Sequence, residues 1–555
     1  MGYLRKLPFA DFSLWKKENK PPIRGFLNLD IQTYSTSDPT GYKWGTATRR
    51  PRSCHFGMSP NLETLFPDSL KLKHAGNLQI PVNALVTDSR RVIPGSVFFA
   101  IPGLRTNGTF YVEEAIDRGA VAVVLESDQI YPQVTTIQVE DIRKVVAQVS
   151  RNFYEKPDER LELIGITGTN GKTTVSYIVQ SLLKGVSNRL TGLIGTIQYD
   201  LGHRTLPSFK TTPEAIDSFS LLKQMLEAGC TRSVIEVSSH GIDQKRIFGM
   251  DLKIAVFLNL TQDHLDYHGD LETYFKVKQS LFTGEICGLP EYAVVNLDDS
   301  YSKRLVSEMD STVKLRTFSM ENNRADFYLS NYQCDHAGSR FTLNWSGGKL
   351  KGSTKLPGLY NLSNILAALA VCDCLGIAIE TVLPILEIFP GVPGRMERIE
   401  EAEGYDVFVD YAHTDDALDK ALSMLRGITR ERLLVTFGCG GNRDRDKRKS
   451  MMEVAQRHAD FVCATSDNPR GESIEAIFED MKAGVQDSDS IEFNPDRKLA
   501  IGRVLGLAQP GDTVLIAGKG HETMQEFKDR IVPFDDRVVT WEVLKIKQLE
   551  KLRKK

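Results

Sequence analysis

From about residue 80 onward, short apolar runs alternate with longer amphipathic stretches. The segments "NALVTDSRRVIPGSVFFAI" and "AVAVVLE" are typical of strands, and "YVEEAIDRG" between them is typical of a helix. The alternation continues in "LELIGITG", "CTRSVIEVSS" and "KIAVFLNLT", and returns after residue 400 in "YDVFVDYAH", "RLLVTFGCGG", "ADFVCATSDNP" and "DTVLIAGKG". Buried β-branched runs separated by helices predict an α/β fold with parallel sheets.

Three segments depart from this alternation. The stretch "ADFYLSNYQCDHAGSRFTLNWSGGKLKGSTKL" changes polarity with period two, which predicts a small antiparallel excursion. The apolar segment "YNLSNILAALAVCDCLGI" predicts a buried helix, in which Cys372 and Cys374 are buried thiols. The segment "GVPGRMERIE" has the proline and glycines of a linker and leads into a last domain.

Residues 1–57 differ from the rest of the chain. They contain ten Lys and Arg against four Asp and Glu, two of the four tryptophans, and no periodic apolar pattern. This composition favours a disordered extension, with an interaction arm or a targeting peptide as the alternative.

Length and charge restrict the class of protein. A chain of 555 residues favours three or four domains. Its net charge of −3 gives no reason to expect nucleic acid or a membrane as a partner, and no apolar run reaches the ~18 residues that span a bilayer. The eight cysteines lack metal-ligand spacing, and no signal-peptide core is apparent. We therefore expect a cytoplasmic location.

The segment "LELIGITGTNGKTTVSYIVQSLL" is the strongest single motif. An apolar strand ends in a turn rich in glycine, and an amphipathic helix follows. Gly168 and Gly171 allow backbone N–H groups to surround phosphate oxygens, and the helix N-terminus adds partial positive charge. Lys172, expected as an exposed loop lysine, can reach the β and γ phosphates, and the Thr173 hydroxyl can bind Mg²⁺.

This motif is not a complete Walker A loop. Such a loop has a glycine where this chain has Ile166, and the nearest glycine is Gly165. A GTPase or a motor ATPase is disfavoured, because no DxxG or NKxD motif follows and the next apolar run ends in Glu236.

Ten fragments occur in a fixed order: "TGTNGKTT", "TTPE", "EVSSHGIDQKR", "DHLDYHG", "LPGLYNLSN", "GRME", "VDYAHT", "FGCGGNRDRDKR", "DNPRGE" and "GKGHE". Together they resemble the Mur ligase family over residues 65–545. The resemblance implies an N-terminal α/β uridine-binding domain over 58–155, a central P-loop parallel-sheet domain over 156–392 and a C-terminal Rossmann-like α/β domain over 393–555.

The resemblance also implies an activity. The chain would use ATP to join meso-2,6-diaminopimelate to UDP-N-acetylmuramoyl-L-alanyl-D-glutamate through an acyl phosphate, as a monomer. Two anions must meet in such a reaction, so charge neutralisation and positioning dominate catalysis. The implied nucleotide-binding residues are Gly168, Thr169, Asn170, Gly171, Lys172, Thr173, Thr174, Asn361, Asn364, Arg395 and Asp410.

Two Mg²⁺ ions are implied by the same resemblance. Thr173 and Glu236 would hold the first, and His264 and Lys278 the second. Lys278 would carry a carbamate derived from CO₂, which turns a cation into an anionic oxygen ligand. Lys276, two residues earlier, is the competing register. Together with Lys172, the residues Lys278, His264 and His413 are the implied catalytic residues.

The remaining implied residues bind the two other substrates. The UDP-sugar dipeptide would contact Thr87, Ser89, Thr211, Thr212, Ser238, Gln244 and Arg246, with its uridine near the turn at Asn107. Diaminopimelate would contact Arg443, Asp467, Asn468, Arg470, Gly518 and Glu522. Asp415 departs from the resemblance, since the family usually has proline there, and this makes the local loop conformation uncertain.

Three other functions remain as alternatives. A lysine-adding relative is disfavoured by "DNPR", because an arginine would repel the lysine ammonium. A folylpolyglutamate synthetase is disfavoured by the same motif and by "TDSR…PGSVFFA". A catalytically inactive scaffold that binds the UDP-sugar peptide is disfavoured by the intact Lys172, Thr173, Glu236, His264 and Lys278.

Overall fold

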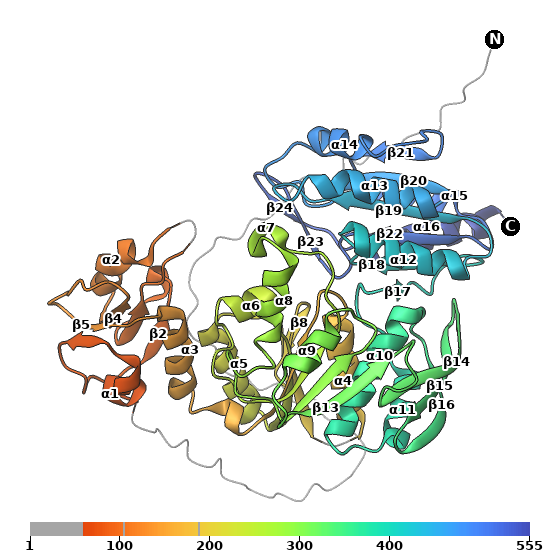
Figure 1. Ribbon diagram of the computed structural model, residues 1–555. Helices are drawn as coiled ribbons and strands as arrows, with labels where there is room; N and C mark the ends of the chain where they lie inside the picture. Colours follow the sequence, from red (N-terminus) through yellow and green to blue (C-terminus); the bar gives the residue numbers. More distant parts are fainter. Residues whose placement is uncertain (1–58, 104–105, 187–188, 555) are drawn as a thin grey trace, which may run out of the picture. The chain divides into compact units, whose positions relative to one another are not determined.

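The computed structural model of the protein describes residues 59–103, 106–186 and 189–554 (Figure 1). The extension expected over residues 1–57 therefore lies outside the described residues. Three α/β domains follow, each built on its own main sheet. Within the described ranges, no helix combines the length and apolar character needed to cross a membrane.

The first sheet has the strand order β1-β5-β4-β3-β2, with β2 to β5 parallel and β1 antiparallel at the edge. The helix predicted in "YVEEAIDRG" is α2. The elements are β1 (Lys73–Ala75), β2 (Ala84–Val86), β3 (Ser96–Phe99), β4 (Ala120–Leu125), β5 (Thr135–Gln138), α1 (Leu62–Leu65), α2 (Val112–Asp117) and α3 (Ile142–Phe153).

The central sheet has the order β16-β15-β14-β13-β12-β11-β6-β10-β7-β8-β9. Its strands are β6 (Glu162–Thr167), β7 (Leu190–Ile194), β8 (Gln198–Asp200), β9 (Thr205–Pro207), β10 (Cys230–Glu236), β11 (Leu252–Phe257), β12 (Tyr292–Asn296), β13 (Lys314–Ser319), β14 (Phe327–Asp335), β15 (Gly338–Trp345) and β16 (Gly348–Thr354). The predicted antiparallel excursion is confirmed as β14 to β16, which extend this sheet at one edge.

Both faces of the central sheet are covered, which explains its continuous apolar strands. Alternate residues of β6 point to opposite faces: Ile164 and Ile166 pack with α4 and α10, whereas Leu163 packs with α5 and α8. The predicted buried helix is α10, and its two cysteines are buried thiols. The helices are α4 (Lys172–Val186), α5 (Ala215–Glu227), α6 (Ser239–Asp243), α7 (Leu265–His268), α8 (Leu271–Gln279), α9 (Ser302–Glu308), α10 (Leu359–Cys374) and α11 (Ile379–Ile388).

The third sheet has the order β17-β18-β22-β19-β20-β21 and is parallel except at β17. A separate β23–β24 hairpin follows it. The elements are β17 (Glu397–Arg398), β18 (Asp406–Asp410), β19 (Leu433–Cys439), β20 (Phe461–Ser466), β21 (Ile491–Asn494), β22 (Thr513–Ala517), β23 (Met524–Glu526), β24 (Ile531–Pro533), α12 (Asp415–Ile428), α13 (Asp446–His458), α14 (Ile474–Lys482), α15 (Arg497–Leu507) and α16 (Asp536–Lys554).

Strand order determines where side chains can gather. In the central sheet β6 lies between β10 and β11, and in the third sheet β22 lies between β18 and β19. All of these strands are parallel, so their carboxyl ends meet at one edge of each sheet, where open α/β sheets bind ligands.

Candidate active site

The loop after β6 forms a cradle of backbone groups at the start of α4. Gly168 and Gly171 have φ of 158° and 89°, and a Cβ on Gly171 would lie 2.6 Å from Asn364 Oδ1. The loop therefore packs closely on α10 and requires glycine there. Asn170 N–H donates to the Asn259 side chain at 2.9 Å, which fixes the loop to the end of β11.

Lys172 differs from the exposed loop lysine that the sequence predicted. It is the first residue of α4, is half-buried, and donates from Nζ to the carbonyl oxygens of Gly168 at 2.8 Å and Thr169 at 2.9 Å. Burial lowers the pKa of its ammonium group. The side chain curls over its own loop because those carbonyls satisfy the charge, and phosphate oxygens could take their place.

Glu236, at the end of β10, is fully buried among hydroxyl groups. Its carboxylate accepts from Thr173 Oγ1 at 2.8 Å and from Thr196 through both Oγ1 (2.7 Å) and N (3.0 Å). A Cβ on Gly195 would lie 2.3 Å from Glu236 Oε1, so the chain must pass this carboxylate without a side chain. A carboxylate and a threonine hydroxyl are oxygen ligands of the kind that Mg²⁺ prefers, so these residues fit the ion.

The structure separates the two candidate lysines of α8. Lys278 is 1% exposed, donates from Nζ to the Gly168 carbonyl at 3.0 Å, and lies 4.6 Å from the centroid of the Tyr274 ring. The side chain of Lys276 is 64% exposed and lies 3.8 Å from Glu272. Burial holds the pKa of Lys278 well below its usual value, which favours the neutral amine that a carbamate requires.

His264 lies in a group of aromatic rings beside α8. It has φ of 54° and precedes α7, and its ring centroid is 4.8 Å from that of His240. His240 also contacts the rings of Tyr267 and His268, and His268 contacts Tyr274. These contacts connect the His264 group to the aromatic ring beside Lys278.

Five residues predicted to bind the UDP-sugar dipeptide gather beyond Glu236. Thr212 Oγ1 donates to the Glu236 carbonyl at 2.8 Å and lies 3.1 Å from Ser238 Oγ. Arg246 donates to the Thr212 carbonyl at 2.8 Å and to Gln244 Oε1 at 2.6 Å. Thr211 is linked to this group through Thr196, because the hydroxyl oxygens of the two threonines lie 3.1 Å apart.

The three predicted uridine-side residues lie in the first domain. Thr87 is exposed after β2, and Ser89 is buried and donates to Glu114 Oε2 at 2.7 Å. Asn107 caps its turn by accepting from Thr109 N–H at 3.1 Å.

Four predicted residues lie around the end of β18 or on α10. Asp410 accepts from the backbone N–H groups of Met396 (2.6 Å) and Ala412 (2.8 Å). The Arg395 guanidinium lies 4.3 Å from the centroid of the Tyr411 ring. On α10, Asn361 donates to the Pro357 carbonyl at 2.8 Å and Asn364 lies 3.4 Å from Asn361.

The residues predicted to bind the amino acid lie together at the ends of β19, β20 and β22. Asn468 Nδ2 donates to Glu522 Oε2 at 2.9 Å, and a Cβ on Gly518 would lie 3.0 Å from Asp467 Oδ2. Arg470 has φ of 52° and donates to Glu526 Oε2 (2.9 Å) and to the Gly441 carbonyl (3.0 Å). Arg443 is exposed in the loop after β19.

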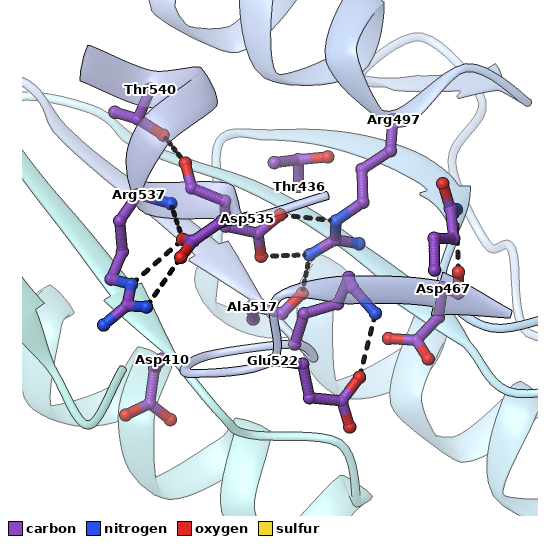
Figure 2. A network of polar contacts seen from close by, with 12 residues as sticks. Asp410, Thr436, Asp467, Arg497, Ala517, Glu522, Asp535, Arg537 and Thr540 are labelled. Carbon is purple, nitrogen blue, oxygen red and sulfur yellow. Dashed lines mark hydrogen bonds and ion pairs between the residues drawn. The ribbon is translucent and has the colours of Figure 1, made fainter. Parts of the chain in front are cut away.

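A buried ion pair supports the strand ends that precede these residues. Arg497 and Asp536, both fully buried, meet through two hydrogen bonds of 2.7 and 2.6 Å. Arg497 also donates to the carbonyl of Ala517 at 2.8 Å (Figure 2) and to that of Ser466 at 3.2 Å. These carbonyls immediately precede Gly518 and Asp467, so the pair fixes the two strand ends that carry these predicted residues.

Sequence reasoning missed several residues of these sites. Thr196 follows β7 in the unremarked tripeptide "GTI", yet it contacts Glu236 twice. Lys519 lies inside "GKGHE" but its burial was not foreseen, and Gln525 and Glu526 follow that motif. Gln525 Nε2 donates to the Asp467 carbonyl at 2.7 Å. Strand β7 was not predicted from the sequence, and a polar residue directly after the short apolar run "GLIG" is the signal that could have found Thr196.

Fold and site together define a P-loop α/β protein whose third domain groups charged side chains at the carboxyl ends of its parallel strands. Family models match the chain as "Mur ligase family, catalytic domain" over residues 81–154, "Mur ligase middle domain" over 166–372 and "Mur ligase, glutamate ligase domain" over 394–520. The chain belongs to the Mur ligase family.

Individual relatives agree. The UDP-N-acetylmuramoyl-L-alanyl-D-glutamate--2,6-diaminopimelate ligase of Solibacter usitatus is 44% identical over 84% of this chain and 94% of its own length. The protein of that name from Geobacillus thermodenitrificans is 41% identical over 82% and 93%. A solved structure of a ligase with that name has a TM-score of 0.64 and 33% identity, covering 88% of this chain and 100% of its own.

Proposed function

We propose that this protein is an ATP-dependent ligase that joins meso-2,6-diaminopimelate to UDP-N-acetylmuramoyl-L-alanyl-D-glutamate in the synthesis of peptidoglycan precursors. The observation that carries the proposal is one chain with both a P-loop beside a buried carboxylate and a pocket of Asn468, Arg470 and Glu522. The names of the similar ligases support the same activity. We assign the first, central and third domains to residues 58–155, 156–392 and 393–555, and a cytoplasmic monomer as the working form.

The nucleotide would lie on the loop after β6. Backbone groups of Gly168 to Thr174 surround its phosphates, while Lys172 neutralises charge at the β and γ phosphates. Asn361, Asn364, Arg395 and Asp410 hold the adenosine. Thr173 and Glu236 would hold one Mg²⁺, and His264 and a carbamate on Lys278 a second. Bound metal supplies charge neutralisation between phosphate and carboxylate.

The remaining residues position the two other substrates. Thr211, Thr212, Ser238, Gln244 and Arg246 hold the dipeptide carboxylate in line with the γ phosphate, and Thr87 and Ser89 contact the uridine end. After phosphate is transferred to the carboxylate, the amine attacks the acyl carbon and phosphate leaves. His413 Nδ1 lies 2.9 Å from the Tyr411 carbonyl, so it donates there and leaves Nε2 to accept the amine proton.

The third domain selects the amino acid. Arg470 faces the distal carboxylate of diaminopimelate with Arg443 beside it, while Asp467, Asn468, Gly518 and Glu522 surround an ammonium group. L-Lysine carries an ammonium where diaminopimelate has a second amino-acid head, so Arg470 would repel it.

The test is phosphate release from ATP with the UDP-sugar dipeptide and each amino acid in turn. Release that requires meso-diaminopimelate is expected. Phosphate release that occurs with lysine but not with diaminopimelate would favour a lysine-adding relative. No phosphate release with any amino acid would favour a binding scaffold.

A further inference from the structure

Lys519 is a fully buried lysine that the proposed reaction has not used. It lies between Gly518 and Gly520, whose φ angles are 109° and 52°, so the chain turns sharply on both sides and directs the lysine inward. A charged ammonium in the interior is costly unless it is paired. The role of Lys519 therefore depends on the groups that pair with it.

Both partners of Lys519 belong to the amino-acid pocket. Nζ donates to Glu522 Oε2 at 2.8 Å and to Asn468 Oδ1 at 3.1 Å. Asn468 Nδ2 donates to the same Glu522 oxygen at 2.9 Å. Glu522 Oε2 thus receives two donors and is held in place, while the glutamate side chain stays 32% exposed. Its other oxygen, Oε1, is the one that can meet a ligand.

The same contacts continue to Arg470. Asn468 Oδ1 accepts a second hydrogen bond, from Glu526 N–H at 3.0 Å, so its amide has one orientation. Glu526 in turn accepts from Arg470 twice, from the backbone N–H at its carbonyl (3.0 Å) and from Nε at Oε2 (2.9 Å). A continuous chain of hydrogen bonds therefore runs from Lys519 through Asn468 and Glu526 to Arg470.

We propose that Lys519 is a positioning residue that sets the distance between an ammonium acceptor, Glu522, and a carboxylate donor, Arg470. The ligand recognised by this pair is a zwitterionic amino-acid head, which carries both charges on one carbon. This inference deepens the proposed function and rests on it. Lys519 also balances the charge of Glu522 in the interior of the domain.

The test compares Lys519→Met, which removes the ammonium at similar length, with Lys519→Gln, which keeps a neutral donor. For Lys519→Met we expect the KM for meso-diaminopimelate to rise by 10- to 100-fold. Its kcat should fall less than threefold, and its KM for ATP should stay within twofold of the wild-type value. The preference for diaminopimelate over L-lysine should fall by a factor similar to the rise in the KM for diaminopimelate. Lys519→Gln should lie between this variant and the wild type. Lys498→Met is the matched control, because Lys498 makes an exposed ion pair with Glu542 on the same domain, and it should behave as wild type.

Each outcome has one reading. An unchanged KM for diaminopimelate in folded Lys519→Met, or equal increases in KM for diaminopimelate and ATP, would overturn the positioning role and leave a structural one. If Lys519→Met does not fold, the test rests on Lys519→Gln. In that case the KM for meso-diaminopimelate must rise at least fivefold for the positioning role to stand. Failure of the proposed function is seen separately, as wild-type protein that releases no phosphate with diaminopimelate.

Discussion

The proposed nucleotide site and the proposed amino-acid pocket are both built at the carboxyl ends of parallel strands, but by different means. The loop after β6 uses backbone groups and one contiguous segment, Gly168 to Thr174, fixed by a few contacts to β11 and α10. The pocket of the third domain uses side chains from four separate segments, joined by Lys519, Asn468 and Gln525. A backbone cradle binds any phosphate chain, whereas selection among amino acids needs fixed charges supported from behind.

The largest effect should follow loss of the Lys172 ammonium from the proposed nucleotide site. We expect Lys172→Ala to lower kcat/KM about a thousandfold or more, since it removes charge stabilisation at the transferring phosphate. The variant should stay folded, because the side chain bonds only to carbonyls of its own loop. Lys184→Ala, on the same helix and paired with Asp200, is the control for melting temperature and phosphate release. Near-normal turnover of Lys172→Ala would refute the nucleotide assignment.

Lys278→Ala should be nearly inactive and partly rescued by acetate or formate, which can occupy the vacated anionic position. Lys276→Ala should keep wild-type activity, because that lysine is exposed on the same helix. Mass spectrometry of active protein equilibrated with bicarbonate, under conditions that preserve the adduct, should show the carbamate on Lys278. An unmodified amine in fully active protein would contradict the second-metal scheme.

In the third domain, loss of a buried charge partner should lower the free energy of unfolding more than loss of an exposed one. Asp536→Ala leaves the Arg497 guanidinium buried and unpaired, which typically costs about 3–5 kcal/mol. Glu542→Ala, on the same helix, breaks only an exposed pair and should cost about 0–1 kcal/mol. Urea unfolding of both variants measures the difference. Equal stabilities would show that the buried pair does not support the strand ends.

Arg470→Ala tests the specificity of the pocket. Removing one partner of a desolvated charge pair typically costs about 2–5 kcal/mol, so kcat/KM for meso-diaminopimelate should fall about 30-fold to several thousandfold. The KM for ATP should change little. Wild-type protein should use L-lysine very poorly. In the variant, the ratio of kcat/KM for meso-diaminopimelate to kcat/KM for L-lysine should be smaller than in the wild type. If the wild type used both amino acids equally, the specificity argument would fail while the ligase assignment would stand.

The two sites also differ in how far the sequence predicts them. The motif around Lys172 is predictable because strand, loop and helix are contiguous, and Glu236 because it ends the next apolar run. The parallel sheets and the β14 to β16 excursion follow from hydrophobic periodicity. Periodicity carries no information on which helical lysine is buried: the family resemblance favoured Lys278, and the structure shows that Lys278 is buried whereas Lys276 is exposed. The burial of Lys519 cannot be predicted from the local sequence, because it depends on the conformations of two glycines and on partners far away in the chain.

The smallest effect concerns Asp415, which stands where the resemblance to the family predicts proline. Asp415 is the first residue of α12, and the preceding Thr414 caps the helix with φ of −122° and ψ of 160°. Proline suits this position, since no helical hydrogen bond needs its N–H and the residue before it is already extended. Asp415→Pro removes a favourable negative charge at the helix N-terminus, which should lower the free energy of unfolding by about 0.3–1 kcal/mol. The proline also restricts the unfolded chain, which should raise the free energy of unfolding by about 0.4–1 kcal/mol. Its melting temperature should therefore stay within a few degrees of wild type and its phosphate release within twofold. Lys420→Pro, in the interior of the same helix, should cost about 3 kcal/mol or more and serves as the contrast. A large loss of activity in folded Asp415→Pro would instead mean that the aspartate itself contacts a substrate, and that the strand ends of the third domain carry one more functional charge.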